Sequence, residues 1–459
     1  MTLLTCISPI DGSIVAERNT SDLSEAQDTI AALRRAQADW AARPLQERID
    51  LVMAGVNAIG AMNDEIVPEL ARMMGRPVRY GGEFRGFHER AAHMAQIAQR
   101  SLAPIEVGED ATFKRMIKRI PHGVVFVVAP WNYPYMTAIN TVAPALIAGN
   151  CVVLKHATQT LLVGERMAQA FHDAGVPKDV FANLFLDHAT TSELIKARSF
   201  DFINFTGSVG AGAQIEQAAA GTFVGVGTEL GGKDPGYVMD DADLTAAVET
   251  LIDGAMFNSG QCCCGIERIY VHETLYDAFL AKAIEIVKGY KLGNPLDSDT
   301  TIGPMAHKRF ADEVRAQIAE ALDMGAVAHI PTLPQDDGGT YLTPQILTNV
   351  THDMRVMRDE SFGPVVGIMP VKNDDEAIAL MNDSSFGLTA SLWTRDVERA
   401  ERVGDRIETG TVFLNRADYL DPGLCWTGCK NTGRGGGLSE IGYHNLTRPK
   451  SYHLKKVTS

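Results

Sequence analysis

The sequence has little basic charge and no long uninterrupted apolar run. Its 42 lysines and arginines are outnumbered by 57 aspartates and glutamates, so the formal net charge is −15. Such a charge repels phosphate backbones and anionic lipids, and we therefore expect neither nucleic acid nor a membrane as the main partner. A membrane helix needs about 20 consecutive apolar residues, but the longest apolar stretch, 137–154, is interrupted by Asn140, Pro144 and Asn150.

The cysteines also lack the even, regular spacing of a secreted disulfide framework, since seven of them lie at positions 6, 151, 262, 263, 264, 425 and 429. The chain does not open with a basic segment and an apolar core, so we expect a cytoplasmic protein with reduced thiols. Zinc sites usually space their cysteines about two to four residues apart, and a contiguous triplet does this poorly, so we expect no metal. The triplet alone is compatible with a redox switch, a nucleophile with two neighbours, or small apolar side chains in a core.

What is present is the composition of a globular protein, with 45% apolar and 22% charged residues over 459 positions. That length suggests about three domain-sized units. The first hundred residues have mainly helical periodicity, whereas from residue 121 short apolar runs alternate with helical patterns. Buried strands are predicted at 123–129, 151–154, 181–186 and 202–205, with helices between them. This alternation predicts an α/β fold with a parallel sheet and a ligand crevice at the carboxyl ends of its strands.

A series of separated motifs follows one another along the chain. They are Pro130-Trp-Asn-Tyr-Pro134, Lys155, Phe205-Thr-Gly-Ser208, Glu229-Leu-Gly-Gly-Lys233, Gly260-Gln-Cys-Cys263, Glu360-Ser-Phe-Gly-Pro364 and Gly410-Thr-Val-Phe-Leu-Asn415. In kind and order they resemble the aldehyde dehydrogenase superfamily, and the resemblance covers almost the whole chain.

The resemblance implies three parts: a Rossmann-type parallel-sheet cofactor domain, an α/β catalytic domain, and a small bridging or oligomerisation element. It implies an NAD(P)-binding domain at 1–102 and 122–231, a catalytic domain at 232–431, and the bridging element at 103–121 and 432–459. A homodimer or homotetramer is expected, with the arm formed by the last residues as a candidate for subunit pairing.

The resemblance also implies the catalytic residues. Cys263 matches the nucleophile, Glu229 the general base that activates water, and Asn132 the side-chain donor of an oxyanion hole. The chemistry suits these residue types, because a thiolate is strongly nucleophilic near neutral pH and a partly desolvated carboxylate can accept a proton there. Some family members carry a lysine where this chain has Thr141 and a glutamate where it has Gly435, so Glu229 is expected to be more isolated here.

The sequence lacks the Gly-x-Gly-x-x-Gly fingerprint of many dinucleotide-binding proteins. The resemblance nevertheless implies that the cofactor is NAD or NADP. The implied contacts are Trp131, Lys155, Thr158, Gly207, Ser208, Gly212, Glu360 and Phe362. Many members have Lys-Pro-Ala-Glu, in which the glutamate binds the adenosine 2′-hydroxyl, but this chain has Thr158 in that place. Since threonine does not repel a 2′-phosphate, we expect NADP to be accepted as well as NAD.

The implied substrate contacts are Tyr133, Met136, Asn140, Cys262, Cys264, Arg416, Tyr419 and Leu420. They predict a mixed pocket for a medium-sized, aromatic or polar aldehyde, or for one with an anionic tail. Arg416 is either the cation for that tail or a structural ion-pair partner. The expected function is NAD(P)-dependent oxidation of a small-molecule aldehyde to its acid through a thiohemiacetal and a thioester. The alternatives are a coenzyme-A-acylating enzyme, which Glu229 argues against, and a catalytically silent binding or redox scaffold on the same fold.

Overall fold

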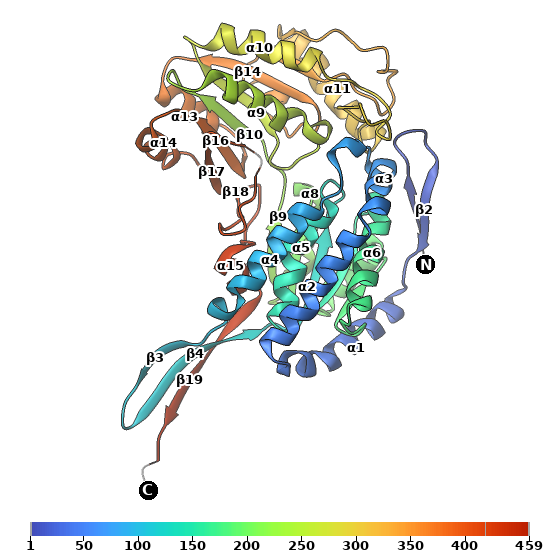
Figure 1. Ribbon diagram of the computed structural model, residues 1–459, viewed down its shortest axis with the longest axis vertical. Helices are drawn as coiled ribbons and strands as arrows, with labels where there is room; N and C mark the ends of the chain where they lie inside the picture. The colour runs from blue at the N-terminus through green and yellow to red at the C-terminus, as the bar shows by residue number, and fades with distance from the viewer. Residues whose placement is uncertain (1, 418, 458–459) are drawn as a thin grey trace.

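The structure of the protein is a computed structural model, which describes residues 2–417 and 419–457. Two α/β bodies lie one above the other in Figure 1, and a long β arm extends from them at the lower left. Each of the three parts is organised around its own sheet. The three sheets fall within the three predicted segments, whose boundaries stay a prediction; Thr458 and Ser459, at the end of the bridging element, lie outside the described residues.

The first sheet has five parallel strands in the order β7-β6-β5-β8-β9. Its two central strands are buried along their whole length, which explains why they appear in the sequence as unbroken apolar runs. The strands are β5 (Val124–Ala129), β6 (Cys151–His156), β7 (Phe181–Asn183), β8 (Phe202–Thr206) and β9 (Gly225–Glu229). The predicted parallel sheet is confirmed.

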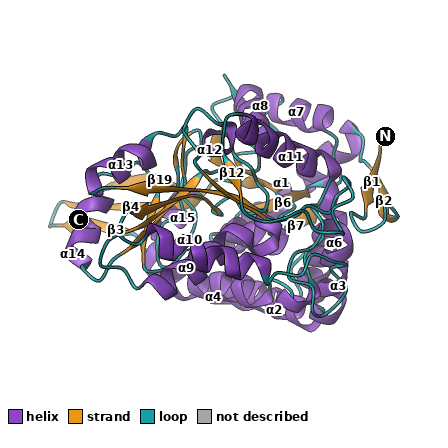
Figure 2. Ribbon diagram, turned by 90° about the horizontal axis from the view of Figure 1, so that it is seen from above, coloured by secondary structure: helices purple, strands orange, loops and turns teal. Residues whose placement is uncertain are grey.

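Helices cover both faces of this sheet, with α7 and α8 on one side and α2, α4 and α6 on the other in Figure 2. Helix α1 begins with a reciprocal cap between Asp22 and Glu25, and near its end Trp40 donates its indole N–H to Leu146 O at 2.9 Å. The helices are α1 (Leu23–Ala42), α2 (Leu45–Ala61), α3 (Asn63–Met74), α4 (Phe84–Ser101), α5 (Pro134–Ile147), α6 (Leu161–Asp173), α7 (His188–Lys196) and α8 (Val209–Ala219).

The second sheet has seven strands in the order β12-β13-β14-β11-β10-β16-β17, and all its pairs except β12 with β13 are parallel. Its strands are β10 (Asp234–Val238), β11 (Ile266–His272), β12 (Val327–Ala328), β13 (Gln345–Thr348), β14 (Val365–Val371), β16 (Thr389–Trp393) and β17 (Thr411–Leu414). The helices of this body are α9 (Leu244–Met256), α10 (Tyr276–Lys288), α11 (Lys308–Asp323), α12 (Arg355–Arg358), α13 (Asp374–Asn382) and α14 (Val397–Gly404).

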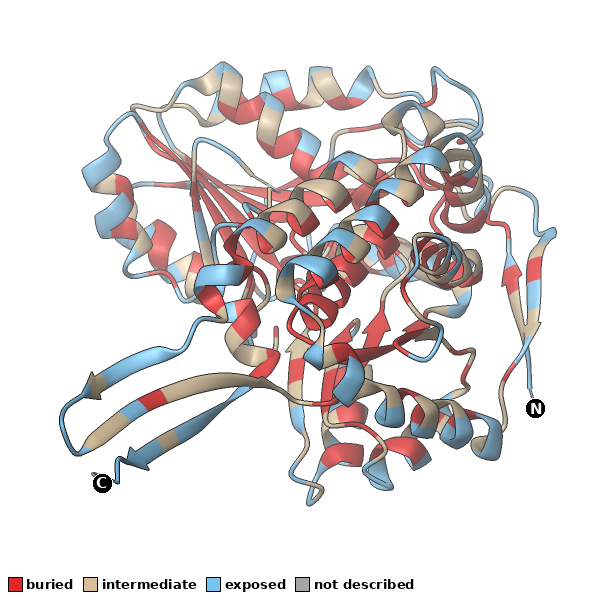
Figure 3. Ribbon diagram, turned by 60° about the horizontal axis from the view of Figure 1, so that its bottom comes forward, coloured by how far each residue is buried: buried red, intermediate tan, exposed pale blue. Residues whose placement is uncertain are grey.

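The arm is an antiparallel sheet of β19 (Thr447–Lys455), β4 (Phe113–Pro121) and β3 (Ile105–Glu109). Figure 3 shows it reaching away from the body, with mostly exposed residues in the outer strands β3 and β19 and mostly half-buried residues in the central strand β4. An N-terminal hairpin, which the sequence analysis did not predict, pairs β1 (Leu3–Ile7) with β2 (Ile14–Asn19). The remaining elements are η1 (Val78–Tyr80), η2 (Thr158–Thr160), η3 (Phe257–Gly260), β15 (Phe386–Gly387), β18 (Cys429–Lys430) and α15 (Ser439–Asn445).

One apolar core surrounds the five-stranded sheet, and two others lie on the faces of the seven-stranded sheet. Among the described residues, no helix combines the length and the apolar character that crossing a membrane requires.

Candidate active site

The carboxyl ends of four of the five parallel strands carry residues that the motifs single out. Asn132 follows β5, Lys155 lies near the end of β6, Ser208 follows β8, and Glu229 is the last residue of β9. Because parallel strands present their carboxyl ends at one edge of a sheet, these positions share the edge where ligands bind in such folds.

The cysteine triplet follows a strained turn. In η3, Asn258 and Ser259 have left-handed backbones with φ of 54° and 56°. Gly260 follows with φ of 70°, and a Cβ there would lie 2.2 Å from Gly363 O. Gln261 then fixes the turn, because its side chain donates to Asn258 O at 3.1 Å and accepts from the N–H of Ala306 at 2.7 Å.

The three thiols differ in exposure and in pKa. Cys262 and Cys264 are buried and their sulfurs lie 3.5 Å apart, whereas Cys263 is partly exposed. Hydrogen bonds from both neighbours lower the pKa of the Cys263 thiol to about 6, against burial and the charge of Glu229, which raise it. The hydrogen bond with Cys263, more than burial, raises the pKa of Cys262 to about 12. The arrangement therefore places one thiolate on Cys263 near neutral pH.

Cys263 opens into a cavity of about 290 Å³. Six of the eight predicted substrate residues belong to its wall, which consists of Arg90, Tyr133, Met136, Thr137, Asn140, Glu229, Thr250, Asp253, Gly254, Phe257, Cys262, Cys263, Cys264, Ala417, Leu420 and Trp426. The two others are absent from it. Arg416 lies over the ring of Tyr419 at 3.9 Å, and the Tyr419 hydroxyl donates to Glu89 at 2.6 Å. They thus tie the loop after β17 to α4.

Glu229 is acted on by two side chains that the sequence analysis did not single out. Burial raises the pKa of its carboxyl group, whereas Trp426 and the guanidinium of Arg90 lower it. The indole N–H of Trp426 lies close enough to favour the charged carboxylate, without the geometry of a full hydrogen bond. A base with a raised pKa beside a reactive thiol suits proton abstraction from water. One feature of the sequence could have pointed to Arg90: it is an arginine within the apolar stripe of its helix.

Asn132 lies against the cysteine turn, outside the cavity wall. Its side-chain N–H donates to Gln261 O at 3.3 Å, and its own carbonyl accepts from Arg76 at 2.5 Å. Arg76 forms a buried ion pair with Glu83 at 2.7 Å, and Glu83 also accepts the backbone N–H of Met136 at 2.7 Å. This network holds the Asn132 loop, α4 and α5 in one arrangement.

A second group of residues surrounds the predicted nicotinamide position. Trp131 stacks on Phe310, with ring centroids 5.2 Å apart, and meets Phe362 edge-on at 5.6 Å. Glu360 accepts the backbone N–H of Gly232 at 3.0 Å, and burial raises the pKa of its carboxyl group to about 8. A Cβ on Gly231 would lie only 2.4 Å from a carboxylate oxygen of Glu360, so glycine is needed for this approach.

A buried ion pair supports the Glu360–Phe362 segment from behind. Lys233 and Glu267 have side chains that are 0% and 5% exposed, and their charged atoms lie 2.5 Å apart. Glu267 also accepts the backbone N–H groups of Ser361 and Phe362, at 2.8 and 2.9 Å.

The predicted adenosine and pyrophosphate contacts lie along the same sheet edge. Lys155 is buried, and desolvation lowers the pKa of its amine, whereas Thr158 is exposed in η2. Ser208 caps α8 by accepting from the N–H of Ala211 at 3.4 Å. At Gly207 and Gly212 a Cβ would lie 2.8 Å from the ring of Phe205 and 2.5 Å from Leu230. The N-terminus of α8 fits a dinucleotide phosphate, and the two glycines allow the chain there to pack closely on Phe205 and Leu230.

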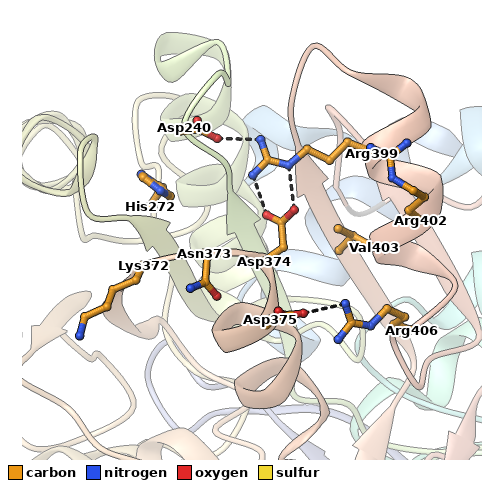
Figure 4. Close-up of a pocket in the computed structure, with 10 residues that line it drawn as sticks. All are labelled: Asp240, His272, Lys372, Asn373, Asp374, Asp375, Arg399, Arg402, Val403 and Arg406. Carbon is orange, nitrogen blue, oxygen red and sulfur yellow. Dashed lines mark hydrogen bonds and ion pairs between the residues drawn. The ribbon is translucent and has the colours of Figure 1, made fainter.

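A larger cavity, of about 540 Å³, lies elsewhere, beside α13 and α14. Figure 4 shows Arg399 held between Asp240 and Asp374, and Arg406 paired with Asp375. Its charges are largely paired with one another and no thiol lines it. The smaller cavity is therefore the candidate active site.

Comparison with known proteins agrees with this geometry. The model of the aldehyde dehydrogenase family matches residues 2–452. The chain belongs to the aldehyde dehydrogenase family. Among relatives of this aldehyde dehydrogenase, a succinate-semialdehyde dehydrogenase [NADP(+)] of Deinococcus radiodurans is 31% identical, over 97% of this chain and 93% of the relative. Betaine aldehyde dehydrogenase 2 of Rhizobium meliloti is also 31% identical, over 98% of this chain and 94% of the relative.

Solved structures of other proteins are also similar to this chain. The NADP-dependent glyceraldehyde-3-phosphate dehydrogenase of Bacillus halodurans, complexed with NADP, superimposes with a TM-score of 0.93 at 32% identity, covering 99% of this chain and 96% of that one. The succinic semialdehyde dehydrogenase of Streptococcus pyogenes, with NADP+ as cofactor, gives a TM-score of 0.94 at 27% identity, covering 99% and 100%. The predicted fold class is thereby confirmed.

Proposed function

We propose that this aldehyde dehydrogenase oxidises a small aldehyde to its carboxylic acid with NAD or NADP, through a covalent intermediate on Cys263. The observation that carries the proposal is the partly exposed, low-pKa thiol of Cys263 in one cavity with Glu229, whose pKa is raised by burial. This pairs a nucleophile with a base at the pH of the cell.

In the first half-reaction the Cys263 thiolate forms a bond to the aldehyde carbon, and the carbonyl electrons move to oxygen. The Asn132 amide and the backbone N–H of Cys263 stabilise that oxyanion; removing one such donor typically costs about 10²- to 10³-fold in rate. When bound, the nicotinamide supplies the hydride acceptor that converts the adduct to a thioester.

In the second half-reaction Glu229 takes a proton from water, and the resulting hydroxide adds to the thioester carbon. The carbon–sulfur bond then breaks, so the acid leaves and the Cys263 thiolate is restored. Trp426 and Arg90 oppose the effect of burial on Glu229, and so keep a share of it ionised and able to accept the proton.

For the cofactor, Ser208 and the start of α8 would hold the pyrophosphate, and Lys155 the adenosine ribose. Glu360 and Phe362 would hold the nicotinamide end. Thr158 presents no carboxylate to the adenosine ribose, which supports acceptance of NADP as well as NAD. Relatives whose names specify NADP support the same proposal.

Two features support an oligomeric, intracellular enzyme. The exposed β19-β4-β3 arm would pair with another subunit in a homodimer or homotetramer. All seven thiols are free, as expected in a reducing compartment such as the cytoplasm.

Steady-state and single-turnover kinetics test the mechanism. Cys263→Ala should abolish cofactor reduction, whereas Cys425→Ala, a partly exposed thiol outside the cavity wall, should retain it. Glu229→Gln should still give a burst of one reduced cofactor per site and then accumulate a thioester visible by mass spectrometry. Native turnover in Cys263→Ala would disprove the nucleophile. Turnover of the native enzyme only with added coenzyme A would favour the acylating alternative.

A further inference from the structure

Arg76 is a buried arginine between the loop that carries Asn132 and the turn that carries the cysteines. The residue is only 4% exposed, so its guanidinium must find its hydrogen-bond partners inside the protein. Nη2 donates to Asn132 O at 2.5 Å, Nε donates to the side-chain oxygen of Asn258 at 3.2 Å, and Nη1 donates to the Glu83 carboxylate at 2.7 Å. The guanidinium also lies over the ring of Tyr133, 4.7 Å from its centroid. Arg76 thus contacts both segments at once through a rigid, planar group.

Asn258 completes the connection between the two segments. Its side-chain N–H groups donate to Asn132 O at 3.4 Å and to Gln261 O at 3.2 Å. The Asn132 amide donates to the same oxygen of Gln261 at 3.3 Å. A side-chain amide has two N–H groups, and the bond to Gln261 uses one of them to set the direction of the other. Because Gln261 lies two residues before Cys263, these bonds hold the proposed oxyanion donor at a fixed separation from the proposed nucleophile.

Close backbone contacts fix the segment from which Arg76 projects. Gly75 ends α3 with a left-handed φ of 84°, and a Cβ on it would clash with Pro304 O. A Cβ on Gly303 would in turn clash with Gly75 O. The carbonyl of Gly303 also accepts the Ser259 hydroxyl at 2.9 Å, and Ser259 belongs to the cysteine turn. The backbone beside Arg76 and the cysteine turn therefore pack against the same short segment.

Stability alone does not explain an ion pair at this place. The side chains of Arg76 and Glu83 are 4% and 1% exposed. Removing two charges from water is costly, and replacing a buried pair by apolar side chains of similar volume is often neutral or stabilising. Within the described chain neither residue belongs to the wall of the cavity beside Cys263, so neither would touch the substrate. What the guanidinium adds over an apolar side chain is a fixed hydrogen-bond geometry at Asn132 and Asn258.

We propose that Arg76 is a positioning residue for oxyanion stabilisation. It holds the Asn132 amide where it can donate to the oxygen of a carbonyl group that Cys263 attacks. The inference rests on the proposed function, since it concerns the addition step of that mechanism. A displacement of about 1 Å in a catalytic site can cost about 100-fold in rate, and loss of an oxyanion donor costs about 10²- to 10³-fold. Loss of the Arg76 contacts should therefore slow carbonyl addition by about 10- to 100-fold.

Two reactions of the same thiol separate this role from a general structural one. The ester 4-nitrophenyl acetate is attacked at its carbonyl carbon, so a sulfur–carbon bond forms, the carbonyl electrons move to oxygen, and collapse of the adduct expels 4-nitrophenolate. Iodoacetamide is attacked at a saturated carbon, so iodide leaves and no oxyanion forms. Neither reaction needs the nucleotide or the physiological aldehyde. The ratio of the two rates at Cys263 therefore measures oxyanion stabilisation separately from the nucleophilicity of the thiol.

The first measurement compares variants of Arg76. Arg76→Lys keeps the counter-ion of Glu83 but not the planar fork, and should slow the burst of 4-nitrophenolate by about 10-fold. Arg76→Gln combined with Glu83→Gln removes both charges together and should slow it by up to about 100-fold. Alkylation of Cys263 by iodoacetamide, followed by mass spectrometry, should change by no more than about threefold in either variant. Arg72→Lys, at an exposed position of α3, is the matched control and should keep both rates.

A double-mutant cycle tests the route through Asn132. Asn132→Ala alone should slow the burst by about 10²- to 10³-fold. If Arg76 acts through the Asn132 amide, adding Arg76→Lys should slow the burst by no more than about a further threefold, because residues that act as a unit are not additive. A general structural role would instead multiply the two losses.

Losses that multiply in the double variant would overturn the proposal, and so would an equal loss in both reactions of the thiol. A native burst in the Arg76 variants would also overturn it, while leaving the proposed function intact. A native enzyme that releases no 4-nitrophenolate, or a burst that survives Cys263→Ala, would refute the proposed nucleophile itself. A native burst in Asn132→Ala would refute the proposed oxyanion donor. If one Arg76 variant does not fold, the other still decides.

Discussion

Replacing Glu267 by Gln tests how the cofactor-side loop is held. In the native protein Glu267 accepts three hydrogen bonds: from Lys233, and from the backbone N–H groups of Ser361 and Phe362. Glutamine retains the shape but leaves Lys233 as a buried charge without its counter-ion, in a side chain that is 0% exposed. Breaking such a pair typically costs about 3–5 kcal/mol of the free energy of unfolding.

Urea unfolding followed by circular dichroism measures this loss. Asp312→Asn, which breaks the exposed pair with Lys308, is the control and should cost about 1 kcal/mol or less. The double variant Lys233→Met with Glu267→Leu should be more stable than Glu267→Gln, because no buried charge is left unpaired. KM for the cofactor should rise in Glu267→Gln, since one of the two carboxylate oxygens that accept the backbone N–H groups of Ser361 and Phe362 is replaced by a donor. If Glu267→Gln costs no more than Asp312→Asn, the reasoning about the buried pair is refuted.

Three further predictions concern single residues of the site. Cys264→Ala removes a hydrogen bond that stabilises the Cys263 thiolate, so the midpoint of the pH dependence of iodoacetamide inactivation should move above about 6; an unchanged midpoint would contradict the role of the neighbour. Thr158→Glu should raise KM for NADP far more than KM for NAD, measured by cofactor reduction, and equal changes would argue against a 2′-phosphate near this position. Gly231→Ala places a Cβ 2.4 Å from Glu360, so fluorescence titration should show weaker cofactor binding at near-native stability, whereas native affinity would remove the need for glycine there.

The sequence predicts those parts of the fold that depend on local periodicity. Strands β5 and β6 are buried on both sides, so their apolar runs are unmistakable. Strand β10 was not predicted, because Pro235 and Gly236 disfavour strands in isolation. Strand β11 was not predicted because Glu267 and Arg268 interrupt its apolar residues; both are buried, and their partners lie far away in the sequence. Such long-range pairing has no local signal.

The residues of the candidate site also differ in whether the sequence alone predicts them. The sequence singles out Cys263, Glu229 and Asn132 because they lie in short motifs, and the structure brings them to one region. Arg90 enters the cavity only because α4 packs on α5, which no motif encodes. Arg416 follows a motif directly, yet its side chain turns toward Tyr419, outside the cavity wall. Motifs thus identify the proposed reacting groups, whereas tertiary packing determines which charged side chain lies beside them.

The close approach of Gly260 to Gly363 has a consequence for the order of events in catalysis. The turn that carries the thiol and the loop that ends in Glu360–Phe362 touch through bare backbone, with no side chain between them to absorb a displacement. We therefore expect occupancy of the proposed nucleotide site and reactivity of the thiol to be thermodynamically linked, and such linkage is reciprocal. If nucleotide binding changes the affinity of Cys263 for a reversible covalent ligand by some factor, that ligand must change the affinity of the protein for nucleotide by the same factor. The affinity of the enzyme at each of the two proposed ligand sites would thus depend on whether the other site is occupied.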